Sequence, residues 1–147
     1  MTTETEANQI ESLLAQQAQA IRNRDIPQAA KNYAPNAMIF DVVGPLGHAE
    51  GSNSVSERLS QWISGFQPNT PIDFEQSSLS ISAGEDHAFS HAFNHVHAIL
   101  TNGNVLDMYW RETLNWRRID GNWKIVHAHS SVPFDPTTGM ASTGLKP

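Results

Sequence analysis

A single aspartate interrupts an otherwise apolar stretch early in the chain. Asp41 follows the apolar residues 37–40 and precedes Val42 and Val43, and a loop containing three glycines, residues 44–51, comes next. At the end of a strand, an aspartate commonly caps nearby backbone N–H groups. A carboxylate held in an apolar pocket can instead accept and release protons during catalysis. The sequence leaves both roles open, and we take Asp41 as a candidate catalytic residue.

Two charged residues stand side by side in a later, otherwise apolar segment. Arg111 and Glu112 lie between Trp110 and Leu114, and successive side chains of a strand point to opposite faces, so one of the two must face inward. A buried charge without a partner is costly. If Arg111 faces inward, its candidate partners are Asp41, Asp107 or the carboxylate of a substrate.

Histidines recur at a spacing of two residues. His127 and His129 share one face of a predicted strand, and His95 and His97 repeat the spacing. Such a pair can contribute to a metal site, but metal sites usually need a third and a fourth ligand. We therefore expect no bound metal and no cofactor. His129 is interpreted as a pocket histidine that transfers protons near neutral pH.

Apolar periodicity predicts helices first and strands afterwards. Helices are expected over about residues 4–23, 25–33 and 54–66, with capping-box spacing at Thr3–Glu6 and Ser54–Glu57 and a cap at Asp25. A strand is expected around residues 36–43, and further strands over about 72–81, 87–101, 105–118 and 123–132. Helices followed by a run of antiparallel strands predict an α+β fold.

Two hairpins determine which strand residues share a face. We interpret Asn102-Gly103 as a two-residue turn and residues 119–121 as a three-residue turn. On this register one face has the composition of a pocket floor: Ala88, Ser90, Ala92, Asn94, Tyr109, Arg111, Thr113, Trp123, Ile125, His127, His129 and Ser131. The other face is rich in aromatic residues: Phe89, His91, Phe93, His95, His97, Met108, Trp110, Leu114 and Trp116. A slip of one residue in either turn would exchange the faces.

The first face supplies the predicted site. Asp41 and His129 are the expected catalytic residues, and the expected ligand-binding residues are Asn94, Tyr109, Arg111, Thr113, His127 and Trp62. The aromatic face would not be left open to water. Since the three helices are needed over the first face, we expect a second copy of the chain to cover the aromatic face, giving a homodimer.

Composition limits the class of protein. The chain has 147 residues and a formal net charge of -6, without cysteine. A single domain is expected over residues 1–147, with a surface tail at 135–147. The acidic balance argues against nucleic acid as a partner. No apolar run approaches the length of a membrane span, and the polar N-terminus does not resemble a signal peptide, so we expect a cytoplasmic protein without membrane association.

Two motifs carry a resemblance to a known family. "NYAPNAMIFDVVGPLGHAEG" and "WRETLNWRRIDGNWKIVHAHSS" resemble segments of SnoaL-like, ketosteroid-isomerase-like members of the nuclear-transport-factor-2-like superfamily. The resemblance covers nearly the whole chain. It implies a cone-shaped, strongly curved sheet wrapped around three N-terminal helices, a cystatin-like α+β barrel, with a pocket at the open end and a dimer through the outer sheet face.

The resemblance also bears on chemistry. It places Asp41 where ketosteroid isomerase has its general base. Where that enzyme has a tyrosine and a protonated aspartate, this chain has Gln17 and Trp110, neither of which is a strong acid. The superfamily also contains polyketide cyclases, dehydratases, hydrolases and binding domains.

Three hypotheses follow for the function. In the first, the protein is a cofactor-independent isomerase, cyclase or dehydratase that transfers protons next to a carbonyl group of a small apolar organic molecule. In the second, the same pocket only binds a ligand, or the domain serves dimerisation. In the third, the His-x-His pair forms a metal-dependent site.

Overall fold

Three helices precede most of the sheet. The computed structural model describes residues 5–49 and 51–147. Its helices are α1 (Glu6–Arg22), α2 (Ile26–Ala30) and α3 (Gly51–Ser64). The buried residues of α1 include Ile10, Leu14, Ala18 and Ile21, so the predicted apolar face is confirmed.

The helix starts agree with the prediction in part. Asp25 caps α2 by accepting a hydrogen bond from the Gln28 N–H. The cap of α1 is Thr5, whose hydroxyl accepts a hydrogen bond from the Asn8 N–H at 3.2 Å, and the expected cap Thr3 lies outside the described residues. α3 begins one turn earlier than expected, at Gly51.

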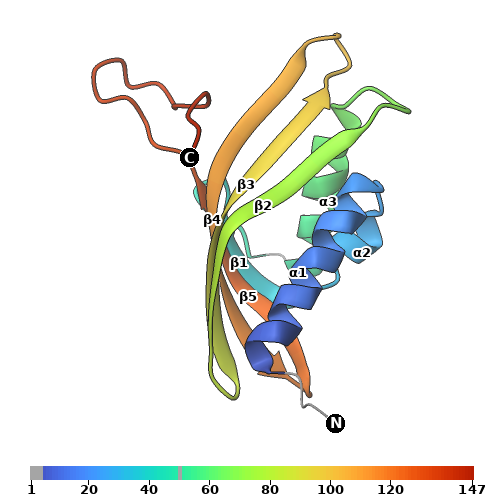
Figure 1. Ribbon diagram of the computed structural model, residues 1–147, viewed down its shortest axis with the longest axis vertical. Helices are drawn as coiled ribbons and strands as arrows, with labels where there is room; N and C mark the ends of the chain where they lie inside the picture. Colours follow the sequence, from blue (N-terminus) through green and yellow to red (C-terminus); the bar gives the residue numbers. More distant parts are fainter. Residues whose placement is uncertain (1–4, 50) are drawn as a thin grey trace.

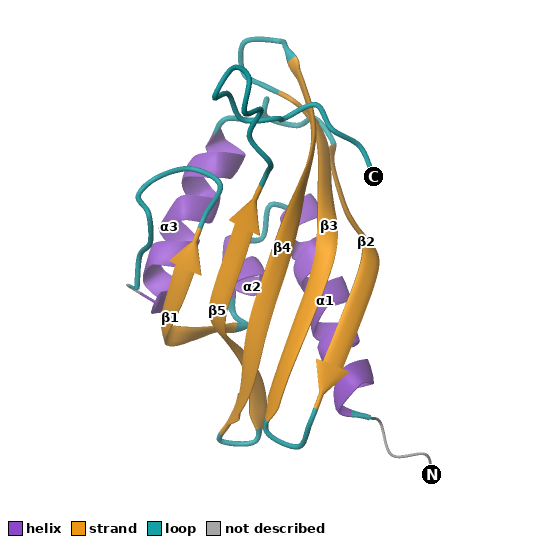
Figure 2. Ribbon diagram, turned by 90° about the vertical axis from the view of Figure 1, so that its left-hand side faces the viewer, coloured by secondary structure: helices purple, strands orange, loops and turns teal. Residues whose placement is uncertain are grey.

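The strands form one mixed sheet. They are β1 (Tyr33–Phe40), β2 (Ile72–Ala83), β3 (His87–Ile99), β4 (Val105–Ile119) and β5 (Asn122–Ser131). Their order across the sheet is β1-β5-β4-β3-β2, with β1 parallel to β5 and the other neighbours antiparallel. The sheet is strongly curved, and the helices lie on its concave side (Figures 1 and 2). The expected α+β class and curved sheet around three helices are thus confirmed, although the sheet is not closed.

The β3–β4 hairpin differs from the predicted one. The strand pairing runs to Ile99 and Val105, and the Leu100 N–H then donates to the Asn104 carbonyl at 2.8 Å. Three residues, 101–103, thus form the turn instead of the predicted two. The register therefore shifts by one residue, and Arg111 lies opposite Phe93 instead of Asn94.

This shift exchanges the faces of β4. The residues opposite buried Ala88, Ser90, Ala92 and Asn94 are Trp116, Leu114, Glu112 and Trp110, and these point toward the helices. The predicted inward facing of Tyr109, Arg111 and Thr113 is wrong, as is the predicted outward facing of Met108, Trp110, Leu114 and Trp116.

The β4–β5 hairpin also differs, for two reasons. Its turn has two residues, Asp120 and Gly121, with φ angles of 51° and 82°, as a tight hairpin turn of mirror-image type requires. A bulge then leaves Val126 unpaired, because Trp116 pairs with Ile125 while the preceding residue of β4 pairs with His127. Beyond such a bulge the alternation of faces is reversed.

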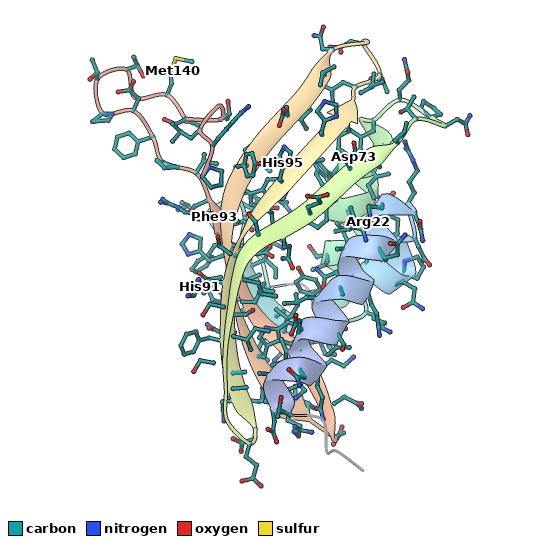
Figure 3. The ribbon with its side chains drawn as sticks, in the orientation of Figure 1. Arg22, Asp73, His91, Phe93, His95 and Met140 are labelled. Atoms are coloured by element: carbon teal, nitrogen blue, oxygen red, sulfur yellow. The ribbon has the colours of Figure 1, made fainter. Side chains whose placement is uncertain are left out.

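The bulge divides β5 into two halves. Trp123 and Ile125 are buried, as predicted, whereas beyond the bulge Ala128 and Ser130 are the buried residues. The predicted inward facing of His127 and His129 is therefore wrong. The outward facing predicted for β3 is correct, and Figure 3 shows His91 and Phe93 on the side of the sheet away from the helices.

The chain continues beyond β5 as a loop that stands away from the sheet (Figure 1). Within it, the Asp135 N–H donates to the Met140 carbonyl and the Ser142 N–H to the Pro133 carbonyl, both at 2.7 Å. Among the described residues, no helix combines the length and the apolar character needed to cross a membrane.

Candidate functional site

A cavity of about 570 Å³ lies between the helices and the concave face of the sheet. Most of its lining is apolar: Leu14, Ala18, Ile21, Ile39, Val55, Leu59, Trp62, Phe74, Val96, Leu106, Met108 and Trp110. A few polar groups interrupt this lining, namely Gln17, Tyr33, Asp41, His48, Arg58, Gln61, Gln76, Asn94, Glu112 and Ser130. An apolar cavity with a few convergent polar groups is the typical setting of a small-molecule site.

Glu112 is a carboxyl group on the cavity wall contributed by the middle of β4. The Ser130 hydroxyl on the neighbouring strand β5 donates to Glu112 Oε2 at 3.1 Å. The Asn94 side chain on β3 is also hydrogen-bonded to Glu112, and Gln76 Nε2 donates to Asn94 Oδ1 at 2.9 Å. Four adjacent strands thus support one carboxyl group with neutral partners.

This setting favours the protonated form of Glu112. Burial raises the pKa of Glu112, and the hydrogen bonds from Asn94 and Ser130 only partly oppose this, while the negative charge of Asp41 raises the pKa further. A carboxylic acid that stays protonated can donate a hydrogen bond to a substrate oxygen.

Tyr33, the first residue of β1, is a second acid in the cavity. Burial holds the pKa of the Tyr33 hydroxyl far above its usual range and the charge of Asp41 adds to this, although a hydrogen bond with Gln17 opposes it. Gln17 is fixed in turn by the Asn32 side chain, which donates to Gln17 Oε1 at 3.1 Å. The Tyr33 hydroxyl is therefore a neutral hydrogen-bond donor.

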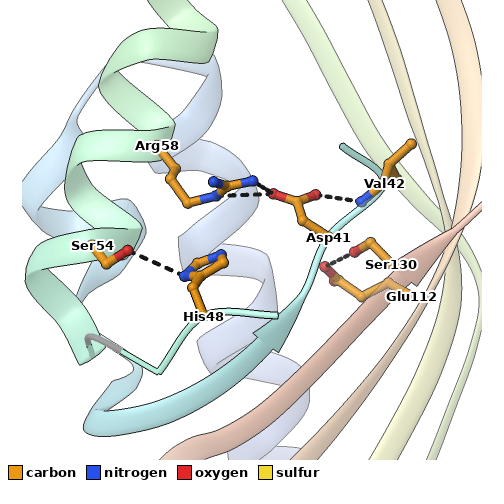
Figure 4. A network of polar contacts seen from close by, with 7 residues as sticks. All are labelled: Asp41, Val42, His48, Ser54, Arg58, Glu112 and Ser130. Atoms are coloured by element: carbon orange, nitrogen blue, oxygen red, sulfur yellow. Dashed lines mark hydrogen bonds and ion pairs between the residues drawn. The ribbon is translucent and has the colours of Figure 1, made fainter. Parts of the chain in front are cut away.

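Asp41 differs from these two acids because it is ion-paired. Its Oδ2 accepts hydrogen bonds from Arg58 Nη2 at 2.9 Å and Arg58 Nε at 3.2 Å, and its Oδ1 accepts one from the Val42 N–H at 2.7 Å (Figure 4). Asp41 lines the cavity and is partly exposed, so it lies at the mouth. It is thus both a cap of local backbone and a cavity carboxylate.

The strand register brings Asp41 close to Glu112. Phe40, the last residue of β1, pairs with His129 of the parallel strand β5, so the next residue, Asp41, comes alongside Ser130. Ser130 in turn pairs with Glu112. The two carboxyl groups therefore flank Ser130 on one row of the sheet: Asp41 is ion-paired, and Glu112 has a raised pKa.

The glycine loop after Asp41 is tied back to β1. The His48 N–H and carbonyl form two hydrogen bonds with Ile39, at 3.0 and 2.8 Å. The His48 ring, through Nδ1, is 3.1 Å from the Ser54 hydroxyl of α3 (Figure 4). These contacts join the loop to both walls of the cavity mouth.

The residues predicted for the site fall into two groups. Asp41, Asn94 and Trp62 line the cavity. Tyr109, Arg111, Thr113, His127 and His129 do not, because the changed register places them on the outer face. Arg111 Nε donates to Ser131 Oγ at 2.8 Å and is not the partner of Asp41. His127 Nδ1 is bonded to the Met38 carbonyl at 2.8 Å.

Sequence reasoning missed Glu112, Ser130, Tyr33, Gln76 and Arg58 as cavity residues. The sequence did carry a signal for Glu112, because residues 111 and 112 are both charged and adjacent strand residues point to opposite faces, so one of the two had to face inward. The Asp-Gly pair at 120–121, a strong two-residue turn signal, also pointed to a different register. The bulge at Val126 had no comparable signal.

Metal ligands do not gather at this site. Within residues 5–49 and 51–147, no three side chains of His, Cys, Asp or Glu are grouped as a metal ion would require.

Comparison with known proteins identifies the family. The model of the SnoaL-like domain matches residues 10–135. The chain belongs to the SnoaL-like domain family. No protein of the curated set matches the sequence.

Solved structures of other proteins share the fold. An NTF2-like protein of unknown function from Pseudomonas putida is 29% identical over 96% of each chain, with a TM-score of 0.83. A ketosteroid isomerase-like protein from Erwinia carotovora atroseptica is 17% identical over 88% of this chain and 97% of its own, with a TM-score of 0.70. A protein from Streptomyces avermitilis, provisionally named a dehydratase, is 14% identical over 90% of this chain and 100% of its own, with a TM-score of 0.74.

Proposed function

We propose that this SnoaL-like protein is a cofactor-independent enzyme that transfers protons next to the carbonyl group of a small, largely apolar organic molecule. The observation that carries the proposal is the contrast within one apolar cavity between an ion-paired carboxylate, Asp41, and an acid whose pKa is raised by burial, Glu112. An ion-paired carboxylate and a buried carboxylic acid in one cavity are suited to divide the roles of base and acid.

The proposed roles follow from the charge of each group. Glu112 and Tyr33, both neutral, donate hydrogen bonds to the substrate carbonyl oxygen and stabilise the negative charge that develops there. Asp41, ionised beside Arg58, removes a proton from the adjacent carbon. The electron pair of that C–H bond forms the enolate. Asp41 then returns the proton to another carbon, or gives it to a β-hydroxyl group, which the enolate expels as water.

The acids lie close to the positions implied by the family resemblance. Those positions hold Gln17 and Trp110, and both line the cavity. Tyr33 is hydrogen-bonded to Gln17, and Glu112 follows Trp110 by two residues on the same face of β4. A hydroxyl and a carboxylic acid are therefore available although neither stands at the implied position.

Exchange of hydrogen for deuterium tests this proposal without knowledge of the natural substrate. Proton NMR in D₂O follows the loss of α-hydrogens from small ketones such as cyclohexanone and 2-tetralone. We expect catalysed exchange with the wild type and a loss of about 100-fold or more in Asp41→Asn, with affinity for the ketone kept within about tenfold. Glu57→Gln, on the exposed side of α3, is the matched control and should exchange like the wild type.

The same experiment distinguishes the proposed enzyme from the alternative, a domain that only binds a ligand. Ketones that bind without catalysed exchange, or equal exchange in wild type and Asp41→Asn, would contradict the enzymatic proposal.

We also propose a homodimer through the outer sheet face. Phe89 and Phe93 support it, since they are 50% and 39% exposed on that face. The mass in solution tests it, because a monomeric mass for the wild type would refute the dimer.

A further inference from the structure

A second hollow, of about 460 Å³, lies on the outer face of the sheet, away from the helices. It adjoins the point where Ser78 adopts a φ of 54° and a bulge interrupts the pairing of β2 with β3. The side chains that line it from the outer face include His91, Arg111, Thr113, His129 and Ser131. Glu112 also contributes to the lining, but its carboxyl group is bonded to Ser130 on the inner side.

The strand register aligns these groups. His91 pairs with Thr113, and Thr113 pairs with His129, so the three form one row across β3, β4 and β5. Arg111 pairs with Ser131 in the next row on the same face. Three of the residues that the sequence analysis assigned to a ligand site, Arg111, Thr113 and His129, thus do meet, but on the opposite face of the sheet.

Arg111 is the charged group of this hollow, and it lacks a counter-charge. Its Nε–H donates to Ser131 Oγ at 2.8 Å, which leaves the N–H donors of its two terminal nitrogens available. Over residues 5–49 and 51–147, no aspartate or glutamate comes within ion-pair distance of Arg111, whereas Arg58 and Arg118 each have one. A guanidinium group held by one neutral contact is suited to bind a carboxylate through two parallel hydrogen bonds.

We propose that the outer hollow is a binding site for a small organic anion that carries a carboxylate on an aromatic ring. Arg111 binds the carboxylate, and the Thr113 hydroxyl and the histidine ring nitrogens supply further hydrogen-bond donors. Phe93, which lines the hollow and is 39% exposed, contacts the ring. The hollow therefore combines an arginine, further hydrogen-bond donors and an aromatic wall.

This site is independent of the proposed catalytic cavity, since it lies across the sheet from it. It is also compatible with a second copy on the outer face. Such a copy would bury Arg111, and a buried cation requires an anionic partner. The carboxylate could then come from a bound molecule or from the second copy, and the experiment distinguishes the two sources.

The test is a titration of the intact protein with 4-fluorobenzoate, followed by fluorine NMR of the ligand and by the backbone amide signals of Thr113 and His129. The neutral analogue 4-fluorobenzamide reports on the contribution of the charge. The variant is Arg111→Gln, and its matched control is Arg117→Gln, six residues along the same face of β4 and outside the hollow.

We expect saturable binding of 4-fluorobenzoate that shifts both amide signals. Affinity should fall at least about tenfold in Arg111→Gln and with the benzamide, and stay within about twofold in Arg117→Gln. Absence of binding to the wild type, or equal binding by Arg111→Gln, would overturn the proposal. Loss of dimer mass in Arg111→Gln without benzoate binding to the wild type would assign the carboxylate to a second copy, and would equally overturn it.

Discussion

Replacing Glu112 by glutamine should change how stability depends on pH. In the folded protein, burial raises the pKa of Glu112 above its ordinary value of 4.5, so the native state holds this proton more tightly than the unfolded chain does. Stability therefore falls as pH rises from about 4.5 to the raised pKa, by at most about 1.4 kcal/mol per pH unit for one proton. Glu112→Gln removes this dependence.

The expected difference in the free energy of unfolding between Glu112→Gln and the wild type has two parts. At pH 4, where the carboxyl group is mostly protonated in both states, glutamine should lower the free energy of unfolding by about 1 kcal/mol, because its amide N–H₂ faces a donor from Asn94 or Ser130. As pH rises, the wild type loses stability relative to the variant. For each pH unit within the interval the difference changes by at most about 1.4 kcal/mol, so the stability deficit of the variant shrinks as pH rises.

Urea unfolding at several pH values between 4 and 8, followed by tryptophan fluorescence, measures this difference. Comparison of wild type and variant cancels the titration of all other groups. The exposed Glu57→Gln is the control and should give a difference that does not vary with pH by more than a few tenths of a kcal/mol. A pH-independent difference for Glu112→Gln, or a stability of the wild type that rises relative to the variant, would refute the reasoning.

Three further predictions concern the fold and the mouth of the cavity, and urea unfolding measures each. Ser90→Ala leaves the buried Trp116 Nε1–H, now 3.0 Å from the serine hydroxyl, without an acceptor and should cost about 1–3 kcal/mol; a loss below about 0.5 kcal/mol would contradict this. Gly121→Ala should cost about 1 kcal/mol because Gly121 has a φ of 82°, whereas Gly144→Ala, with neither a positive φ nor a close neighbour, should be neutral. Arg58→Gln should cost less than about 1 kcal/mol, since its ion pair is 25% and 34% exposed, and a loss above about 2 kcal/mol would show a larger structural role.

The type and order of the elements could be predicted from sequence because each rests on local signals. The apolar face of α1 and the cap at Asp25 are set by residues within a few positions of one another. The inward face of β3 was also predictable, since small and polar residues alternate with aromatic ones along a single strand.

The facing of β4 and of the end of β5 could not be predicted in the same way. It depends on one residue of loop length after Ile99 and on one unpaired residue at Val126, and a slip of one residue reverses a strand. Because the observed β3–β4 register differs from the predicted one by one residue, Arg111 lies on the outer face and Glu112 on the inner face. The identity of the Asp41 partner, Arg58, depends on how α3 packs against β1, which no local pattern encodes.

The most direct test of the proposed acid is the titration of the Glu112 carboxyl carbon by NMR, with ¹³C-labelled glutamate and assignment by the signal missing in Glu112→Gln. The proposed mechanism requires a neutral acid at this position, so the midpoint should lie clearly above the ordinary value of 4.5. A midpoint at or below that value would show that Glu112 is a stabilised carboxylate, and would contradict its role as a hydrogen-bond donor to the substrate oxygen.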